Sequence, residues 1–208
     1  MFAQIKEDLN AIMLRDPAAK SRLEAALCYP GLHAIWLHRI AHHFYKKGWV
    51  VFPRLVNTFS RFLTGIDIHP GATLGPGLFI DHGMGVVIGE TAIVGDNCTI
   101  YQGVTLGGTG KDKGKRHPTL GNNVLVGCGA KLLGNFTVGD NAKIAANAVV
   151  LSDVPENCTC VGIPARIVRR NNEKIAGNFD HVHMPDPISQ EFCRIQIRLD
   201  NLEKRSEE

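Results

Sequence analysis

The chain has 208 residues, of which 44% are hydrophobic, and a formal net charge of +3 at pH 7. This length and composition predict one domain with appendages and enough apolar surface for a packed core. The charge is too small to indicate a nucleic-acid partner. No segment is long and apolar enough to span a membrane, and the N-terminus carries charges early, unlike a signal peptide. We therefore expect a cytoplasmic protein with no membrane partner.

Six cysteines are spread along the chain without paired spacing. In a cytoplasmic protein this pattern favours reduced, mostly buried thiols. Cys158 and Cys160 stand close together, but no second ligand pair accompanies them, so a metal site there is not expected.

Residues 1–65 are predicted to form a helical N-terminal domain. Positions 2, 5, 9 and 12 are apolar and fall on one face of a first helix. Asp16 and Pro17 suit the N-cap and first position of a second helix, whose apolar stripe includes Leu23 and Leu27. Pro30-Gly31 ends that helix, and two further helices are expected over 32–47 and 53–64. At this point Asp16 can be read either as a helix cap alone or as a functional residue.

Residues 66–170 carry a six-residue repeat, which is typical of a parallel β-helix. Turn residues support this, since Gly, Asp and Asn recur at one phase of the repeat, at 95–97, 121–123 and 139–141. An aliphatic residue occupies every sixth position, apart from two breaks: Ile68, Leu74, Ile80, Ile88, Val94, Ile100, Leu106, Leu120, Val126, Leu132, Val138, Ile144 and Val150.

Both breaks in the repeat contain reactive side chains. The first adds two residues between Ile80 and Ile88 and contains Asp81-His82. The second adds eight between Leu106 and Leu120, within a loop over 107–119, and contains Arg116-His117. A scaffold that needs only aliphatic residues is thus interrupted at candidate functional positions.

Residues 171–208 are predicted to be a linker followed by a C-terminal helix. Apolar residues at 188, 192, 195, 199 and 202 follow the spacing of a short coiled coil. A helix lying on its own protomer explains the same pattern equally well.

Several motifs in and between the breaks resemble the serine O-acetyltransferase family, in its short form. The resemblance implies a left-handed β-helix, a homotrimer with active sites between subunits, and acetyl-CoA as co-substrate without a metal. The motifs are Asp67-Ile-His-Pro70, Ile80-Asp-His-Gly83, Val87-Ile-Gly-Glu-Thr91, Gln102-Gly-Val-Thr-Leu-Gly-Gly-Thr-Gly110, Arg116-His-Pro118 and Gly162-Ile-Pro-Ala-Arg166.

Acetyl transfer to an alcohol needs a base, because a hydroxyl is scarcely ionised at neutral pH. Histidine is the natural choice, with an ordinary pKa of about 6.5. His82 lies in the first break, where it can leave the coil surface. The family implies a catalytic dyad in which Asp67 orients His82. No residue beside His82 suits an acyl-enzyme intermediate, so direct attack in a ternary complex is expected.

An amino-acid substrate brings an ammonium and a carboxylate that each need a partner of opposite charge. Arg116 can bind the carboxylate through two parallel hydrogen bonds. The resemblance implies that Asp16 and Asp81 receive the ammonium, and that His117 contacts the substrate beside Arg116. It also implies that Gly108 donates a backbone hydrogen bond to the thioester oxygen as negative charge develops there.

The loop over 107–119 is basic and rich in glycine, but it lacks the spacing of a phosphate-binding P-loop. We expect a mobile lid over coenzyme A, with lysines 111, 113 and 115 near the phosphates or simply in solvent. The resemblance implies that coenzyme A contacts Gly108, Thr109, Cys128, Lys143 and Ala146.

Two other activities remain possible from the residues. A hexapeptide acetyltransferase for a sugar or antibiotic hydroxyl would need the same base but not the clamp for an amino acid. A carbonic anhydrase of the γ type would need three histidines on zinc, and nothing brings His69, His82 and His117 together.

The family also implies regulation and partners. L-cysteine is an expected feedback inhibitor, because it offers the same ammonium and carboxylate as L-serine. Complex-forming members end in isoleucine, whereas this sequence ends in Glu208, so no stable complex with O-acetylserine sulfhydrylase is expected. The short helical region favours a trimer over a hexamer.

Overall fold

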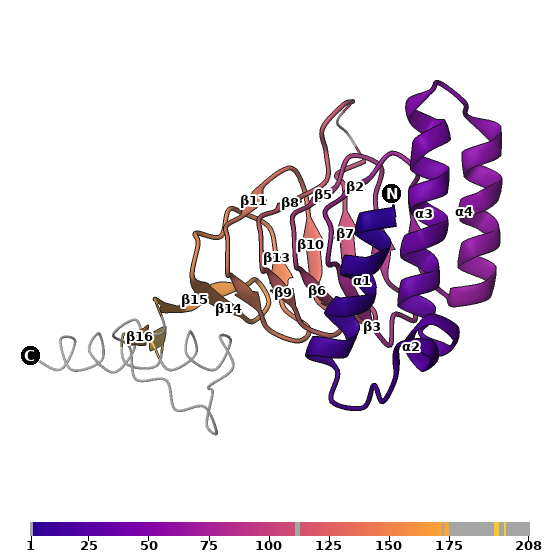
Figure 1. The fold of residues 1–208 in the computed structure, drawn as a ribbon. Helices are drawn as coiled ribbons and strands as arrows, with labels where there is room; N and C mark the ends of the chain where they lie inside the picture. The colour runs from indigo at the N-terminus through magenta and orange to yellow at the C-terminus, as the bar shows by residue number, and fades with distance from the viewer. Residues whose placement is uncertain (1, 111–112, 172, 175–193, 196–197, 199–208) are drawn as a thin grey trace, which may run out of the picture.

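The computed structural model describes residues 2–110, 113–171, 173–174, 194–195 and 198. Helices come first, and a stack of β-helix coils follows them, with α3 and α4 side by side at one end of the stack (Figure 1). The helices are α1 Phe2–Arg15, α2 Arg22–Cys28, α3 Pro30–Lys46 and α4 Val51–Thr64.

The second helix begins later than the sequence predicts. Its N-cap is Ser21, whose hydroxyl accepts a hydrogen bond from the Glu24 amide at 3.1 Å. Asp16 instead closes a turn, because its Oδ1 accepts the Ala18 amide at 2.8 Å. The predicted apolar stripe was also wrong, since two of its leucines are 70% and 67% exposed: Leu23 and Leu27.

Pro30 and Gly31 separate two helices as expected, but they also form the start of α3. Proline is tolerated there because the first helical amides have no partner within the helix. Gly31 packs against the Ile80 carbonyl so closely that a Cβ would lie 2.2 Å from its oxygen. This glycine therefore lets α3 rest directly on the strand that leads to His82.

The coils form three faces of parallel strands, which extend away from the helices. Face 1 contains β1 Asp67–Ile68, β4 Val87–Ile88, β7 Thr105–Gly107, β10 Lys131–Leu133 and β13 Val149–Val150. Face 2 contains β2 Thr73–Leu74, β5 Ile93–Val94, β8 Thr119–Leu120 and β11 Thr137–Val138. Face 3 contains β3 Phe79–Asp81, β6 Thr99–Tyr101, β9 Leu125–Val126, β12 Lys143–Ile144, β14 Cys158–Val161, β15 Arg166–Arg170 and β16 Glu173–Lys174.

The predicted aliphatic repeat is confirmed as the core of the coils. All thirteen positions are at most 8% exposed and belong to one hydrophobic cluster. Each strand places one such residue inside and its neighbour outside, as in the pair Thr73–Leu74. The predicted corner residues are also confirmed, since Asn97, Asn123 and Asn141 adopt φ of 57°, 56° and 59°.

Two polar side chains of α1, Asp8 and Arg15, attach the helical region to the coils. Asp8 is wholly buried, lies 2.9 Å from Arg39 of α3, and accepts the Gly77 amide at 3.0 Å. Arg15 donates to the carbonyls of Gly77 and Cys98 at 3.2 and 3.0 Å. These bonds hold the end of α1, and with it Asp16, against face 3.

The last coil folds back on itself, because β15 pairs antiparallel with β14 and β16 pairs antiparallel with β15. The apolar positions of the predicted C-terminal helix lie largely outside the described residues. Among the described residues, no helix has the length and apolar character needed to cross a membrane.

Candidate active site

The first break in the repeat forms a tight extra turn that carries His82 out of the coil. The Gly83 amide donates to the Asp81 carbonyl at 2.6 Å, and the Met84 amide donates to the His82 carbonyl at 3.0 Å. His82 itself has φ 58°, a left-handed conformation that costs energy outside glycine. Its side chain is 73% exposed, so its imidazole is accessible to a substrate.

Carboxylates from two parts of the chain meet near His82. The Nε2 atom of His82 lies 4.0 Å from Oδ1 of Asp81. Asp16 accepts a 2.6 Å hydrogen bond from the Tyr29 hydroxyl. This bond and the one from the Ala18 amide lower the pKa of Asp16, and His82 lowers it further. The same bond raises the pKa of Tyr29 to about 12, and burial and the charges of Asp16, Glu24 and Asp81 add to this rise. Asp16, Asp81 and His82 therefore lie near one another in the structure.

Tyr29 was missed by the sequence analysis. It is an aromatic residue between two helices, and no local pattern indicates that its hydroxyl reaches a carboxylate thirteen residues earlier. Only the packing of the turn after α1 against the start of α3 brings the two groups together.

Asp67 lies in the coil next to His82, but its hydrogen bonds point elsewhere. Asn57 donates to Oδ1 at 3.0 Å and Arg61 donates to Oδ2 at 3.3 Å, both from α4. Among the described contacts, none is a hydrogen bond between Asp67 and His82. The expected dyad is thus not formed in this single chain, although Ile66 beside Asp67 packs against Gly83, where a Cβ would lie 2.5 Å from its Cδ1.

The second break returns to the coil at a corner between faces 1 and 2, where Arg116 is held by an acid. Its Nη2 atom donates to Oε2 of Glu90 at 2.7 Å, and the Tyr45 hydroxyl donates to Oε1 at 3.1 Å. Burial alone would raise the pKa of Glu90, but the hydrogen bonds from Arg116 and Tyr45 outweigh it and the pKa falls. The guanidinium is therefore oriented before any ligand binds.

His117 is buried at the same corner. Its Nδ1 atom lies 2.8 Å from Oγ1 of Thr91 and accepts the Thr91 amide at 3.2 Å. Burial and the charges of Arg116 and Lys115 lower the pKa of His117. Lys115, which we expected near coenzyme A phosphates or in solvent, donates to the Thr91 carbonyl at 2.7 Å in this structure.

Two glycines leave room for the His117 ring. A Cβ at Gly89 would lie 2.0 Å from Nε2, and a Cβ at Gly108 would lie 3.0 Å from the same atom. Gly108 also packs against Arg116, whose Cγ would be 2.9 Å from such a Cβ. The predicted oxyanion donor thus lies directly beside the two residues expected to bind substrate.

The three faces of the coils meet at three edges, and the predicted site is divided between two of these edges. We define the His82 edge as Asp81, His82, Cys128 and Ala146, and the Arg116 edge as Gly89, Glu90, Gly108, Arg116 and His117. At the His82 edge, strand register and backbone hydrogen bonds place Cys128 between residue 102 of the preceding coil and residue 147 of the following coil. Predicted coenzyme A residues therefore fall on both edges, with Lys143 on the outer surface of face 3.

Face 1 separates these edges within one chain. The segment from residue 83 to residue 89, which contains β4, crosses it, and fully extended it would span at most about 20 Å at roughly 3.3 Å per residue. A serine molecule is far shorter than this. In one chain, His82 and Arg116 therefore lie at opposite edges of face 1.

The alternative metal site is not supported by the described geometry. His117 and His69 lie at the Arg116 edge, where His69 influences the pKa of His117, whereas His82 lies across face 1. Among the residues the structure describes, no group of three or more His, Cys, Asp or Glu could hold a metal ion.

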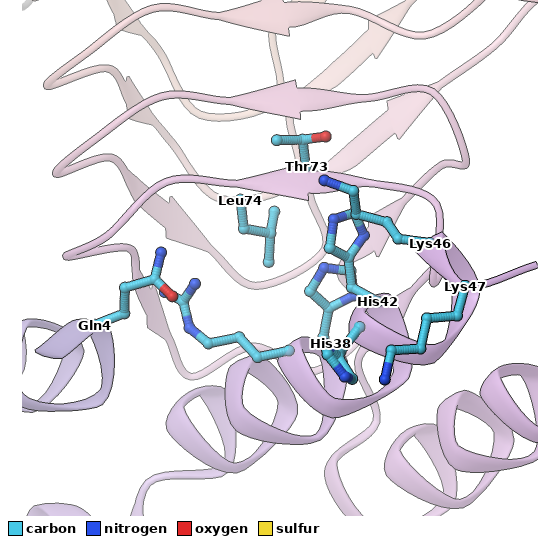
Figure 2. A pocket seen from close by; sticks show the side chains of 9 residues that line it. Gln4, His38, His42, Lys46, Lys47, Thr73 and Leu74 are labelled. Atoms are coloured by element: carbon cyan, nitrogen blue, oxygen red, sulfur yellow. The ribbon is translucent and has the colours of Figure 1, made fainter. Parts of the chain in front are cut away.

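A cavity of about 540 Å³ lies away from these residues, between α1, α3 and β2. Figure 2 shows histidines and lysines along the wall formed by α3 and its C-cap, and Thr73 and Leu74 of β2 opposite. It contains none of the predicted site residues. Its lining is Gln4, His38, Arg39, His42, His43, Lys46, Lys47, Thr73 and Leu74.

Comparisons with known proteins identify the family of the chain. Residues 117–152 match the family model described as bacterial transferase hexapeptide (six repeats). The serine acetyltransferase of Bacillus pumilus is 54% identical over 97% of this chain and 93% of its own length. That of Synechococcus elongatus is 56% identical over 100% of this chain and 84% of its own length.

Solved structures give the same answer. The Neisseria gonorrhoeae serine acetyltransferase in complex with serine matches with a TM-score of 0.78 and 45% identity, covering 81% of this chain and 69% of that one. The Brucella abortus enzyme in complex with coenzyme A matches with a TM-score of 0.80 and 48% identity, covering 81% and 68%. The expected left-handed β-helix of the hexapeptide type is confirmed, and the chain belongs to the serine acetyltransferase family.

Proposed function

We propose that this protein transfers the acetyl group of acetyl-CoA to the hydroxyl of L-serine, giving O-acetyl-L-serine and CoA for cysteine biosynthesis. The observation that carries the proposal is the meeting of an exposed histidine, His82, with two carboxylates, Asp16 and Asp81. A base beside a receptor for an ammonium suits an amino alcohol better than a sugar. Dependence on acetyl-CoA favours a cytoplasmic location.

The reaction follows from the chemistry of these groups. His82 takes the hydroxyl proton while the serine oxygen attacks the thioester carbonyl carbon. The Gly108 amide stabilises the negative oxygen of the tetrahedral intermediate. The carbon–sulfur bond then breaks, and protonated His82 returns the proton to the sulfur of CoA. Asp67 orients the imidazole and stabilises its cation once the site is assembled.

Substrate binding uses the remaining charges. Asp16 and Asp81 bind the ammonium, and Arg116 binds the carboxylate with the help of His117. L-Cysteine offers the same two groups, so it inhibits by competing for this clamp. Coenzyme A lies along the His82 edge of one chain and the Arg116 edge of another, in contact with Gly108, Thr109, Cys128, Lys143 and Ala146.

The divided site supports a homotrimer in which face 1 of each chain lies toward the threefold axis. A closed ring places the His82 edge of one chain against the Arg116 edge of the next, and this repeats identically three times. The active site is then shared between chains, so that His82 of one chain and Arg116 of the next can contact the same serine molecule.

Exposed apolar side chains support the same arrangement. Helix α4, which packs against β1 of face 1, exposes apolar residues in the single chain, and so do the turn at Met84 and strand β4 at Val87. A patch of this kind is typical of a protein–protein interface. Its members and their exposed fractions are Leu55 63%, Phe59 56%, Phe62 85%, Leu63 57%, Met84 68% and Val87 40%.

Two measurements test the proposal. CoA thiol release from acetyl-CoA is followed with L-serine and with a panel of sugars and aminoglycosides, and serine should be the acceptor that supports turnover. Arg116→Lys, which keeps the charge but loses the two parallel hydrogen bonds, should raise the serine KM while leaving the acetyl-CoA KM near its wild-type value. Turnover with a sugar and not with serine would refute the proposed substrate.

Oligomeric state is tested by light scattering. The predicted mass is three times the 22.7 kDa chain. A stable monomer with full serine-dependent activity would refute the shared site.

A further inference from the structure

Thr91 uses every polar atom it has to hold the point where the 107–119 loop returns to the coil. Its hydroxyl oxygen accepts the amides of Arg116 and His117 at 3.0 and 3.2 Å. Its carbonyl accepts the Lys115 ammonium at 2.7 Å. Its amide and its hydroxyl both lie against Nδ1 of His117. Three consecutive loop residues are therefore fixed by a single side chain and its own backbone.

These contacts decide where His117 carries its proton. A backbone amide can only donate, so the Thr91 amide at 3.2 Å requires a lone pair on Nδ1. The hydroxyl oxygen already accepts two amides, which leaves its proton to be donated to the same Nδ1 at 2.8 Å. The ring proton must then be on Nε2, the atom that faces Gly89 and Gly108.

The surroundings also keep this ring neutral. Burial is the main reason that the pKa of His117 is lowered, and the positive charges of Arg116 and Lys115 add to it. Glu90 acts in the opposite direction, but its carboxylate is engaged by Arg116 and Tyr45. The charge of His69, two coils away at the same edge, lowers the pKa further. A neutral imidazole with one proton is a hydrogen-bond donor at Nε2 and has no free lone pair for catalysis.

We propose that Thr91 is a positioning residue that holds His117 with its proton on Nε2, so that His117 donates a hydrogen bond to a substrate oxygen and takes no proton itself. The oxygen belongs to the serine carboxylate, next to Arg116. This inference rests on the proposed function for the identity of the substrate alone. It separates the two site histidines by role, with His82 as base and His117 as donor.

Nitrogen-15 NMR of histidine-labelled protein reads the tautomer directly. In the wild type at pH 7.5, the signals of His117 should be those of a neutral ring protonated at Nε2, assigned by their loss in His117→Asn. A ring protonated at Nδ1, or a cationic ring, would overturn the proposal. This experiment needs no turnover, so an enzyme inactive toward serine would refute the proposed function without affecting the NMR outcome.

Two matched variants test the role of the Thr91 hydroxyl. Thr91→Ser keeps the hydroxyl and should retain the Nε2 tautomer and a serine KM within about twofold of wild type. Thr91→Val has nearly the same shape but lacks the hydroxyl, so the pKa of His117 should rise and the serine KM should increase roughly tenfold, while the KM for acetyl-CoA changes little. Equal NMR titrations and equal serine KM values for both variants would overturn the proposal.

Discussion

Two inactive variants should restore one another within a mixed trimer, because the proposed site draws on two chains. His82→Ala removes the base from one edge, and Arg116→Ala removes the carboxylate partner from the other edge. A homotrimer of either variant has no complete site. A mixed trimer contains a junction at which an intact His82 of one chain meets an intact Arg116 of the next.

The size of this recovery follows from the geometry of the ring. The His82 edge of each chain contacts the Arg116 edge of one neighbour, so the junctions have a direction. A mixed trimer contains two copies of one variant and one of the other. In either case, one of its three junctions joins an intact His82 to an intact Arg116. Mixed trimers should therefore show about one third of the wild-type kcat, with a wild-type serine KM.

The assay uses co-expressed variants with two different affinity tags, purified in succession on both tags so that only mixed trimers remain. CoA thiol release is measured at saturating serine and acetyl-CoA. The matched control pairs His82→Ala with Asp81→Ala, which alter the same edge and should not restore each other. Mixed His82 and Arg116 trimers that stay as inactive as the homotrimers would refute a site shared between these edges.

Three further variants test individual contacts. Gly89→Ala should lower serine kcat/KM about 100-fold, since its Cβ would lie 2.0 Å from the His117 ring and must displace it. Tyr29→Phe should raise the serine KM roughly two- to tenfold, because Asp16 loses a 2.6 Å hydrogen bond worth about 0.5–1.5 kcal/mol. His38→Gln should reduce the loss of unfolding free energy as the pH falls below 6.5. Burial lowers the pKa of His38 from 6.5 to about 3, so in this range the unfolded chain binds a proton that the folded chain does not.

Kinetics and denaturation check these outcomes. For the glycine, Gly110→Ala in the same loop is the control, because a Cβ there meets nothing within 4 Å and activity should persist. For Tyr29→Phe, an equal rise in the KM for acetyl-CoA would contradict a specific role in serine binding. For His38, urea unfolding at pH 7 and pH 5 should show a loss about 2 kcal/mol larger in the wild type than in the variant. Equal losses would contradict a neutral buried His38.

The scaffold was predictable because its signal is periodic and local. Each coil needs one buried aliphatic residue per face and a left-handed residue at a corner. The type and position of residues such as Ile100 and Asn97 are therefore enough to predict burial for the first and a positive φ for the second. The second helix was not predictable in the same way. Asp16 satisfies the sequence rule for an N-cap, but its carboxylate accepts hydrogen bonds from the Ala18 amide and the Tyr29 hydroxyl. The helix begins only after Ser21, which is its N-cap.

The candidate site was predictable to the extent that it interrupts the repeat. His82 and Arg116 are identified because a regular coil has no use for them at those positions. Glu90 and Thr91 lie in a motif that supports the family resemblance, yet nothing in their spacing indicates that they hold Arg116 and His117 across about 25 residues. Such contacts depend on which coils stack, and a single sequence does not encode them locally.

The most direct test of the central claim compares the kcat of His82→Ala with that of the wild type in serine-dependent CoA release. The exposed His43 of α3, replaced by alanine, is the matched control. If His82 is the base, its loss should lower kcat by about 100- to 10,000-fold with the trimer intact, while His43→Ala keeps wild-type activity. A His82→Ala trimer that acetylates L-serine at the wild-type rate would contradict the account.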